Sequence, residues 1–182
     1  MGNKMKYIEV EHKFNVGKTF DREGLFNKIK MLNPINHFST VVVDHYFTTE
    51  RVPHCIYRWR KDPLIEQLTV KEFGGLESEI RFEVNLNVSV SSLDEVEAFL
   101  SPLGILEKKK INKHVWVFEF SDCEVVYYQA KCNRQAFYCV EIEATKVASQ
   151  NQALHLIRKY EEDLDLETFP REKKSLYQMF FS

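Results

Sequence analysis

Charged and apolar residues alternate along many short segments of this chain. Glu9, Glu11 and Lys13 stand at every second position of one such segment. The apolar residues Val10 and Phe14 occupy positions between and directly after these charged residues. Because a strand sends successive side chains to opposite faces, this pattern predicts strands with one ionic and one apolar face. The predicted strands cover residues 6–15, 37–48, 55–61, 66–73, 78–86, 106–119, 123–131 and 136–146.

Helical spacing of apolar residues interrupts the strands and follows the last of them. The predicted helices cover 21–31, 93–102 and 150–163, with a short final helix after Pro170. Ser92 and Ser149 each precede a polar first turn and are predicted to open helices with capping boxes. No repeat or linker divides the chain, so a single domain over 1–182 is the simplest organisation.

Two arrangements of the strands fit the alternation. A half-exposed antiparallel sheet would turn its charged faces to water and its apolar faces to helices. An α+β fold with a closed or nearly closed eight-stranded antiparallel β-barrel would turn the charged faces inward, with helices packed outside. Buried charges must be paired or solvated, so the second arrangement requires a wet cavity that holds metal and a polyanion. Periodicity alone does not choose between them.

Composition narrows the classes of function. The 25 Lys and Arg residues nearly balance the 27 Asp and Glu residues, so no overall field draws the chain to nucleic acid or to a membrane surface. No apolar run approaches the ~20 residues of a membrane span. The four cysteines show no zinc spacing, and cysteines this sparse suit a reducing compartment. We therefore expect a cytoplasmic protein in which anion binding comes from local clusters of cations.

The segment Glu9-Val10-Glu11-His12-Lys13 carries the strongest chemical signal. Its two carboxylates lie about 7 Å apart along a strand, a spacing at which they can hold a hard divalent cation. The lysine beside them can hold an anion. A site that gathers metal and phosphate needs this mixture.

This ExExK segment and seven later ones resemble, in order, the motifs of the CYTH superfamily, the triphosphate tunnel metalloenzymes. The later segments are Asp44-His45-Tyr46-Phe47-Thr48-Thr49, Tyr57-Arg58-Trp59-Arg60, Leu68-Thr69-Val70-Lys71, Arg81-Phe82-Glu83, Lys108-Lys109-Lys110, Val140-Glu141-Ile142-Glu143 and Lys174-Ser175-Leu176-Tyr177.

The resemblance implies a tunnel of eight antiparallel strands that binds Mg²⁺ or Mn²⁺ and a triphosphate chain. By position, the metal candidates are Glu9, Glu11, Glu83, Glu141 and Glu143. The substrate-binding candidates are Lys13, Arg58, Arg60, Lys71, Arg81, Lys108 and Lys110, of which Lys13, Arg58 and Arg60 are also the catalytic candidates. Whether Arg81 faces inward or outward stays open.

The chain departs from the family pattern at several positions. The strand before Glu141 lacks the usual aspartate, and Tyr128 stands at about that place. Asn85 replaces a common glutamate. Loss of a hard anionic oxygen weakens or relocates one metal, and Glu124 or Glu119 could compensate.

The resemblance implies metal-dependent hydrolysis of a triphosphate-bearing small molecule: inorganic tripolyphosphate, thiamine triphosphate or a nucleoside triphosphate. One alternative is a class IV adenylate cyclase that converts ATP to cyclic AMP and pyrophosphate. Another is a tunnel that binds polyphosphate or nucleotide without catalysis. We favour hydrolysis because water is always available, whereas a cyclase must also position a purine and a ribose. The apolar residues of the last helix either cap the tunnel or form a homodimer contact.

Overall fold

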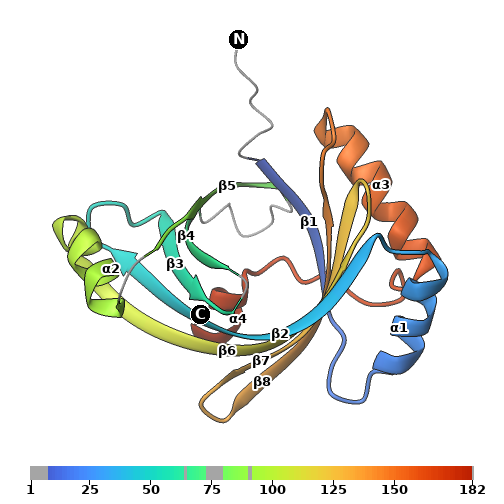
Figure 1. The fold of residues 1–182 in the computed structure, drawn as a ribbon, viewed down its shortest axis with the longest axis horizontal. Helices are drawn as coiled ribbons and strands as arrows, with labels where there is room; N and C mark the ends of the chain where they lie inside the picture. Colours follow the sequence, from blue (N-terminus) through green and yellow to red (C-terminus); the bar gives the residue numbers. More distant parts are fainter. Residues whose placement is uncertain (1–7, 64, 73–79, 90–91, 182) are drawn as a thin grey trace.

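Eight antiparallel strands close into one barrel in the order β1-β5-β4-β3-β2-β6-β7-β8 (Figure 1). The computed structural model describes residues 8–63, 65–72, 80–89 and 92–181. The predicted closed barrel is confirmed, and the predicted strand residues at 6–7, 73 and 78–79 lie outside the described residues. The strands are β1 (Ile8–Asn15), β2 (Asn36–Thr49), β3 (Cys55–Lys61), β4 (Glu66–Glu72), β5 (Ile80–Asn87), β6 (Ile105–Glu119), β7 (Cys123–Cys132) and β8 (Gln135–Ala144).

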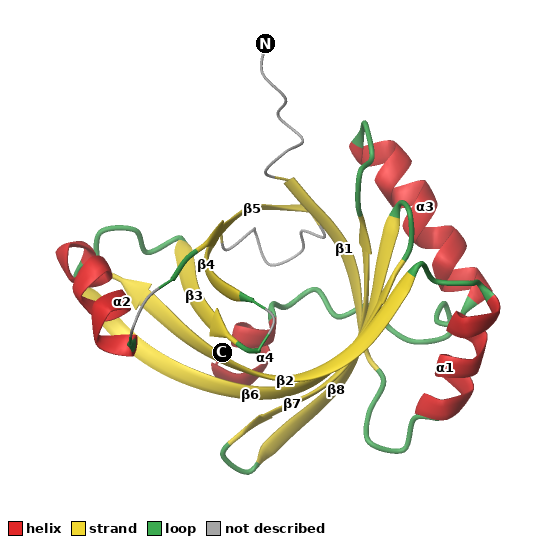
Figure 2. Ribbon diagram, in the orientation of Figure 1, coloured by secondary structure: helices red, strands yellow, loops and turns green. Residues whose placement is uncertain are grey.

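The helices lie around the barrel and at one end of it. They are α1 (Arg22–Met31), α2 (Leu93–Leu100), α3 (Gln150–Asp163) and α4 (Leu176–Phe181), with a 3₁₀ turn (Ser101–Leu103) after α2. Figure 2 shows α1 and α3 on one side of the strands and α2 on the opposite side. Within the described residues, no helix has the length and apolar character that a membrane crossing requires.

The apolar face of β1 points outward and packs against α1 and α3. Val10 and Phe14 belong to one buried cluster with Ile29 of α1 and Ile157 of α3. Burying apolar surface stabilises the fold by roughly 25 cal/mol per Å², so this contact fixes which face of β1 points away from the helices. Glu9, Glu11 and Lys13 lie on the opposite face of the strand and therefore line the barrel interior.

The helix α2 covers a second apolar face, on the far side of the barrel. Its residues Val96 and Leu100 are buried against Phe47 of β2 and Trp59 of β3. Here too the apolar face of the strands packs against a helix, and the face that carries the charged side chains points inward. The half-exposed sheet, with its charges in bulk water, is therefore not the arrangement that forms.

The long strand β6 pairs with β2 on one side and with β7 on the other. Its register with β2 shifts once, where Thr48 pairs with Glu107 and Thr49 pairs with Ile105. Leu106 is the extra residue of this bulge, and it is exposed. The bulge confines the irregularity to the start of β6.

The two predicted capping boxes have different outcomes. At α3, Ser149 Oγ accepts a hydrogen bond from the Gln152 backbone N–H at 3.2 Å, as predicted. At α2, Ser92 has the extended backbone of an N-cap, but its side chain makes no capping hydrogen bond with the described residues. Ser92 is therefore the N-cap residue, as predicted, but the predicted side-chain hydrogen bond of the capping box does not form.

The two serines provide a matched test of this difference. We expect Ser149→Ala to lower the free energy of unfolding by about 1 kcal/mol, the usual value of an N-cap side chain. Ser92→Ala should change it by less than about 0.5 kcal/mol, as for an ordinary surface substitution. Urea unfolding of both variants beside the wild type measures the difference. Equal losses would contradict the assignment.

Candidate functional site

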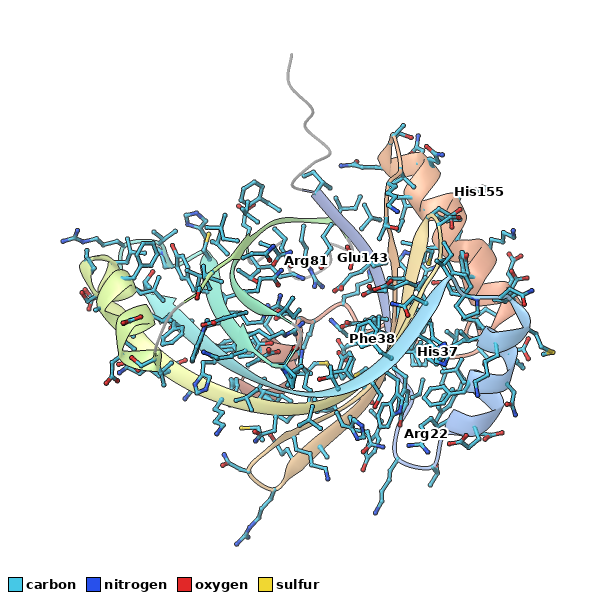
Figure 3. The ribbon with its side chains drawn as sticks, in the orientation of Figure 1. Arg22, His37, Phe38, Arg81, Glu143 and His155 are labelled. Carbon is cyan, nitrogen blue, oxygen red and sulfur yellow. The ribbon has the colours of Figure 1, made fainter. Side chains whose placement is uncertain are left out.

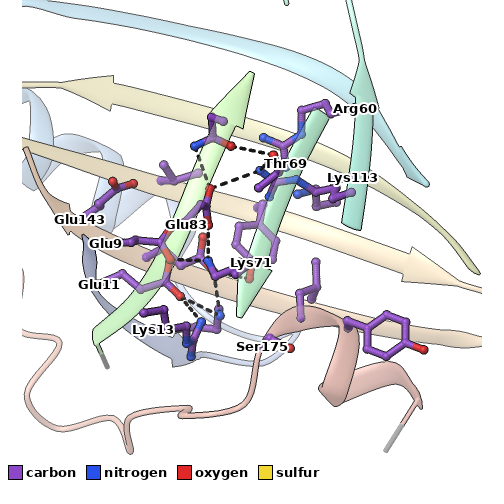
Figure 4. Close-up of a pocket in the computed structure, with 18 of the residues that line it drawn as sticks. Glu9, Glu11, Lys13, Arg60, Thr69, Lys71, Glu83, Lys113, Glu143 and Ser175 are labelled. Atoms are coloured by element: carbon purple, nitrogen blue, oxygen red, sulfur yellow. Dashed lines mark hydrogen bonds and ion pairs between the residues drawn. The ribbon is translucent and has the colours of Figure 1, made fainter. Parts of the chain in front are cut away.

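The barrel encloses a cavity of about 380 Å³ that is lined largely by charged side chains (Figure 4). Its cations are Lys13, Arg58, Arg60, Lys71, Arg81 and Lys113, and its carboxylates are Glu9, Glu11, Glu83, Glu124, Glu141 and Glu143. Figure 3 shows Arg81 and Glu143 inside the ring of strands and His155 outside it, on α3. The cavity thus collects ten of the twelve residues that the motifs point to.

One ion-pair network centres on Lys13. Its Nζ lies 3.0 Å from a carboxylate oxygen of Glu141 and 3.4 Å from one of Glu11. Arg81 Nη1 donates to Glu11 Oε1 at 2.8 Å, so Arg81 faces inward. Burial opposes the charged form of Lys13, but the two glutamates outweigh it and raise the Lys13 pKa. Lys13 therefore stays cationic.

A second network centres on Lys71. Its ammonium forms ion pairs with Glu9 and, at 2.7 Å, with Glu83. Glu83 also lies 3.6 Å from Arg58 and accepts a hydrogen bond from Asn85 at 2.9 Å. Burial acts to raise the Glu83 pKa, but Lys71 and Arg58 hold it below its ordinary value. Asn85, at the position of a family glutamate, thus orients a carboxylate instead of supplying one.

The third network surrounds Asp44 of β2, which is fully buried. Arg60 donates to its two oxygens from Nε and Nη2, at 2.7 and 2.9 Å. Lys113 Nζ lies 2.6 Å from Oδ2. Burial works against the carboxylate, yet Arg60 and Lys113 hold the Asp44 pKa well below its usual range. Asp44 is a permanent anion that fixes two cavity cations.

The prediction that Lys108 and Lys110 line the cavity was wrong. Both lie on the outer face of β6, where Lys108 pairs with Glu97 of α2 and Lys110 is exposed. The cation that β6 contributes to the cavity is Lys113, which is 7 % exposed. Lys113 lies on the same face of β6 as Val115 and Val117, which also line the cavity, so the sequence pattern of β6 gave no clear signal for it.

A row of carboxylates crosses β1, β8 and β7. Glu143 pairs in register with Glu11 on one side and with Glu124 on the other. Like charges directly opposite one another repel. Burial, followed by repulsion from Glu9, Glu11 and Glu124, raises the Glu143 pKa well above its ordinary value. Burial and Glu11 likewise raise the Glu9 pKa to about 8.

The donor chemistry of this row fits a hard dication. Mg²⁺ and Mn²⁺ prefer carboxylate oxygens, and a dication would offset the repulsion that raises these pKa values. Among the residues that the structure describes, however, no three His, Cys, Asp or Glu side chains are already grouped tightly enough to hold an ion. One oxygen of Glu9 is paired with Lys71 and one oxygen of Glu141 with Lys13, so lysines already neutralise part of the charge of these two carboxylates.

Tyr128 stands inside the cavity where the family pattern has an aspartate. Its hydroxyl donates to Glu141 Oε1 at 2.8 Å. Burial raises the Tyr128 pKa well above its ordinary value, so the hydroxyl stays neutral. Glu141 therefore has two hydrogen-bond donors beside it, Lys13 and Tyr128, whereas Glu143 lies between the carboxylates of Glu11 and Glu124.

The helix α4 lies against one end of the cavity. Ser175 and the first two residues of α4, Leu176 and Tyr177, line the cavity. Leu176 and Phe180 are buried in a cluster with Ile111 of β6. Tyr177 Oη donates to Glu107 at 2.5 Å. The apolar residues of the last helix thus cap the tunnel, and the homodimer contact stays an untested alternative.

Comparisons with known proteins bear on the fold of the chain. No protein-family profile matches the sequence, and no curated protein matches it. A structure of a protein from Pyrococcus horikoshii has 19% identity and a TM-score of 0.74, covering 93% of this chain and 98% of that one. A putative adenylate cyclase from Bacillus halodurans has 16% identity and a TM-score of 0.62, covering 96% and 97%. A putative adenylyl cyclase from Hippeastrum with a dominant triphosphatase activity has 11% identity and a TM-score of 0.59, covering 95% and 94%.

These likenesses are of fold, and they extend over nearly the whole chain. The resemblance to the CYTH superfamily that the motifs suggested is confirmed at that level. The chain therefore shares the fold of these proteins, which in this structure is a closed eight-stranded barrel.

Lys113 predicts a pH dependence of anion binding. Burial and Arg60 lower its pKa to about 8, so it is charged below pH 8 and neutral above it. We expect the affinity for tripolyphosphate without metal to fall by about tenfold as pH rises from 7 to 9, relative to Lys113→Arg, which keeps its charge. Calorimetric titration of both proteins measures this. Parallel pH profiles would contradict the assignment.

Proposed function

We propose that this chain hydrolyses a triphosphate-bearing small molecule inside the barrel cavity, with Mg²⁺ or Mn²⁺ as its metal. The observation that carries the proposal is the enclosed cavity in which six cations from five strands face a row of carboxylates. A cation 4 Å from a phosphate oxygen gains about 4 kcal/mol at an effective dielectric near 20. Several such cations can offset the loss of hydration of a short polyanion.

The cations have different parts in holding the phosphate chain. Thr69 fixes Nη2 of Arg58 at 3.0 Å, and Arg58 Nε is buried without a hydrogen-bond partner among the described residues. An arginine fork can bind two phosphate oxygens at once. Lys71 is paired with Glu9 and Lys13 with Glu11 in the free protein, and both lysines would become more available to phosphate when those glutamates bind metal.

The metal would be held by Glu9, Glu11 and Glu143, with Glu124 as a further ligand from β7. When bound, it neutralises charge on the phosphate chain and polarises the bond that breaks. Phosphoryl transfer depends on positioning and charge neutralisation more than on covalent chemistry. Lys113, with its pKa near 8, can also give a proton to the leaving phosphate oxygen.

Hydrolysis is favoured over cyclisation by the contents of the cavity. The hydroxyls of the lining tyrosines Tyr46, Tyr128 and Tyr177 bond to the carboxylates of Asp44, Glu141 and Glu107. Cyclisation requires a fixed purine and ribose, and the tyrosine hydroxyls that could hydrogen-bond to them are already bonded to carboxylates. The dominant triphosphatase activity of the Hippeastrum protein, itself a putative cyclase, is consistent with this preference.

One observation favours a class IV adenylate cyclase as the second candidate. Val115, Val117 and Val126 form an apolar strip on the cavity wall, beside the charged groups. Such a strip could receive a purine ring while the cations hold the triphosphate. The likeness to the putative adenylate cyclase of Bacillus halodurans supports the same candidate.

Product analysis distinguishes the candidates. The purified chain is incubated with tripolyphosphate, thiamine triphosphate or ATP, with Mg²⁺ or Mn²⁺ separately, and the products are resolved. We expect orthophosphate from at least one substrate and no turnover after chelation of the metal. Cyclic AMP with pyrophosphate from ATP would establish the cyclase instead. Tight binding of every substrate without turnover would leave a non-catalytic tunnel.

Two lysines of β6 provide a matched pair for testing the site. We expect Lys113→Met to lower kcat/KM by about 100-fold, or roughly 2.7 kcal/mol, because it removes a buried cation from the cavity wall. Lys110→Met, on the outer face of the same strand, should leave kcat/KM within about twofold of the wild type. Equal losses in the two variants would exclude Lys113 from the site.

A further inference from the structure

The connection between α3 and α4 runs along β1 at the edge of the cavity. We call residues 171–175 the strap. Arg171 forms an antiparallel bridge with Phe14, and the Glu172 backbone N–H donates to the Lys13 carbonyl at 2.7 Å. Three residues after Glu172, the chain enters α4 through Ser175. The strap is thus bonded to the strand that carries the ExExK residues.

Two strap carbonyls hold two of the cavity cations. The Lys173 carbonyl accepts from Arg81 Nη2 at 2.8 Å. The Lys174 carbonyl accepts from Lys13 Nζ at 3.4 Å. Both cations also contact Glu11. Lysine and arginine have several rotatable bonds, so a carbonyl anchor reduces the rotamers that each samples before an anion arrives.

A buried cluster outside the barrel anchors the strap. Glu161 of α3 is 4 % exposed and lies between two bases. Its Oε1 bonds to His12 Nδ1 on the outer face of β1, and its Oε2 pairs with Arg171 Nη2 at 2.9 Å. Burial acts to raise the Glu161 pKa, but the hydrogen bonds from His12 and Arg171 outweigh it and lower the pKa. Glu161 thus ties α3 to both β1 and the strap.

We propose that Glu161 and Arg171 are positioning residues that, through the strap, fix Lys13 and Arg81 for binding phosphate. The proposal rests on the anion-binding cavity of the proposed function. Neither residue lines the cavity, so both act on an anion only through the strap and β1. The cluster also gives a reason for the burial of His12, since the imidazole completes the anchor.

The test compares Arg171→Ala with Arg158→Ala, which removes an exposed arginine of α3. We expect the affinity for tripolyphosphate, measured by calorimetry without metal, to fall about tenfold in Arg171→Ala and to stay unchanged in Arg158→Ala. Arg171→Lys should recover part of the loss because an ammonium can still pair with Glu161. Nitrogen NMR resonances of the Lys13 ammonium and the Arg81 guanidinium should shift in Arg171→Ala alone, together with faster hydrogen exchange at the Glu172 N–H.

The readouts separate failure of the strap from failure of the proposed function. If the wild type does not bind tripolyphosphate, the proposed function fails, and the NMR resonances alone decide the role of the strap. Unchanged Lys13 and Arg81 resonances in a folded Arg171→Ala protein, with the Glu172 N–H freely exchanging, would overturn the inference. If Arg171→Ala does not fold, Glu161→Gln takes its place, because it keeps the shape of the anchor and removes its charge.

Discussion

Charged side chains taken out of water must be paired or solvated, and this constraint governs the interior of the barrel. The protein meets it with three ion-pair networks, centred on Lys13, Lys71 and Asp44. Each network joins different strands, so the pairs link the wall of the cavity as well as neutralising it. Removing one partner of a buried pair costs about 3–5 kcal/mol because the other charge is left uncompensated. The same pairs favour the charged forms of Lys13 and Lys71, because their glutamate partners raise the pKa of both lysines against the effect of burial.

The networks depend on packing outside the barrel. The apolar face of several strands is held against a helix, by α1 and α3 at β1 and by α2 at β2 and β3. These helix contacts turn the charged faces of neighbouring strands inward, so that their charged side chains meet in one cavity. The carboxylate row of Glu11, Glu143 and Glu124 forms for the same reason, since the strand register sets these three side by side. Their repulsion is the opposite of what stability alone would select, and it is a feature typical of functional sites.

The sequence predicts the eight strands and four helices because their periodicity is strong, and the motif order adds the closure of the barrel. It does not predict which lysine of β6 enters the cavity. Lys108, Lys109 and Lys110 place a cation on both faces of the strand. Trp116 and Val115 are both apolar, so the alternation of polar and apolar residues does not identify the inner face. Packing outside the barrel distinguishes the two faces, since Trp116 and Phe118 contact Phe26 of α1 and Lys108 pairs with Glu97 of α2. The partners of Asp44 and the anchor at Glu161 join residues far apart in the chain, and no local pattern encodes them.

The bulge at Leu106 has a consequence for how this protein can change in length. A one-residue insertion or deletion between Ile111 and Lys113 would invert the rest of β6, turn Lys113 outward and bring Trp116 into the cavity. Near Leu106 the strand already accommodates an unmatched residue, and a change there would leave the wall intact. Length variation in homologous chains should therefore be confined to the Gly104 end of β6, and the segment that faces the cavity should be of constant length.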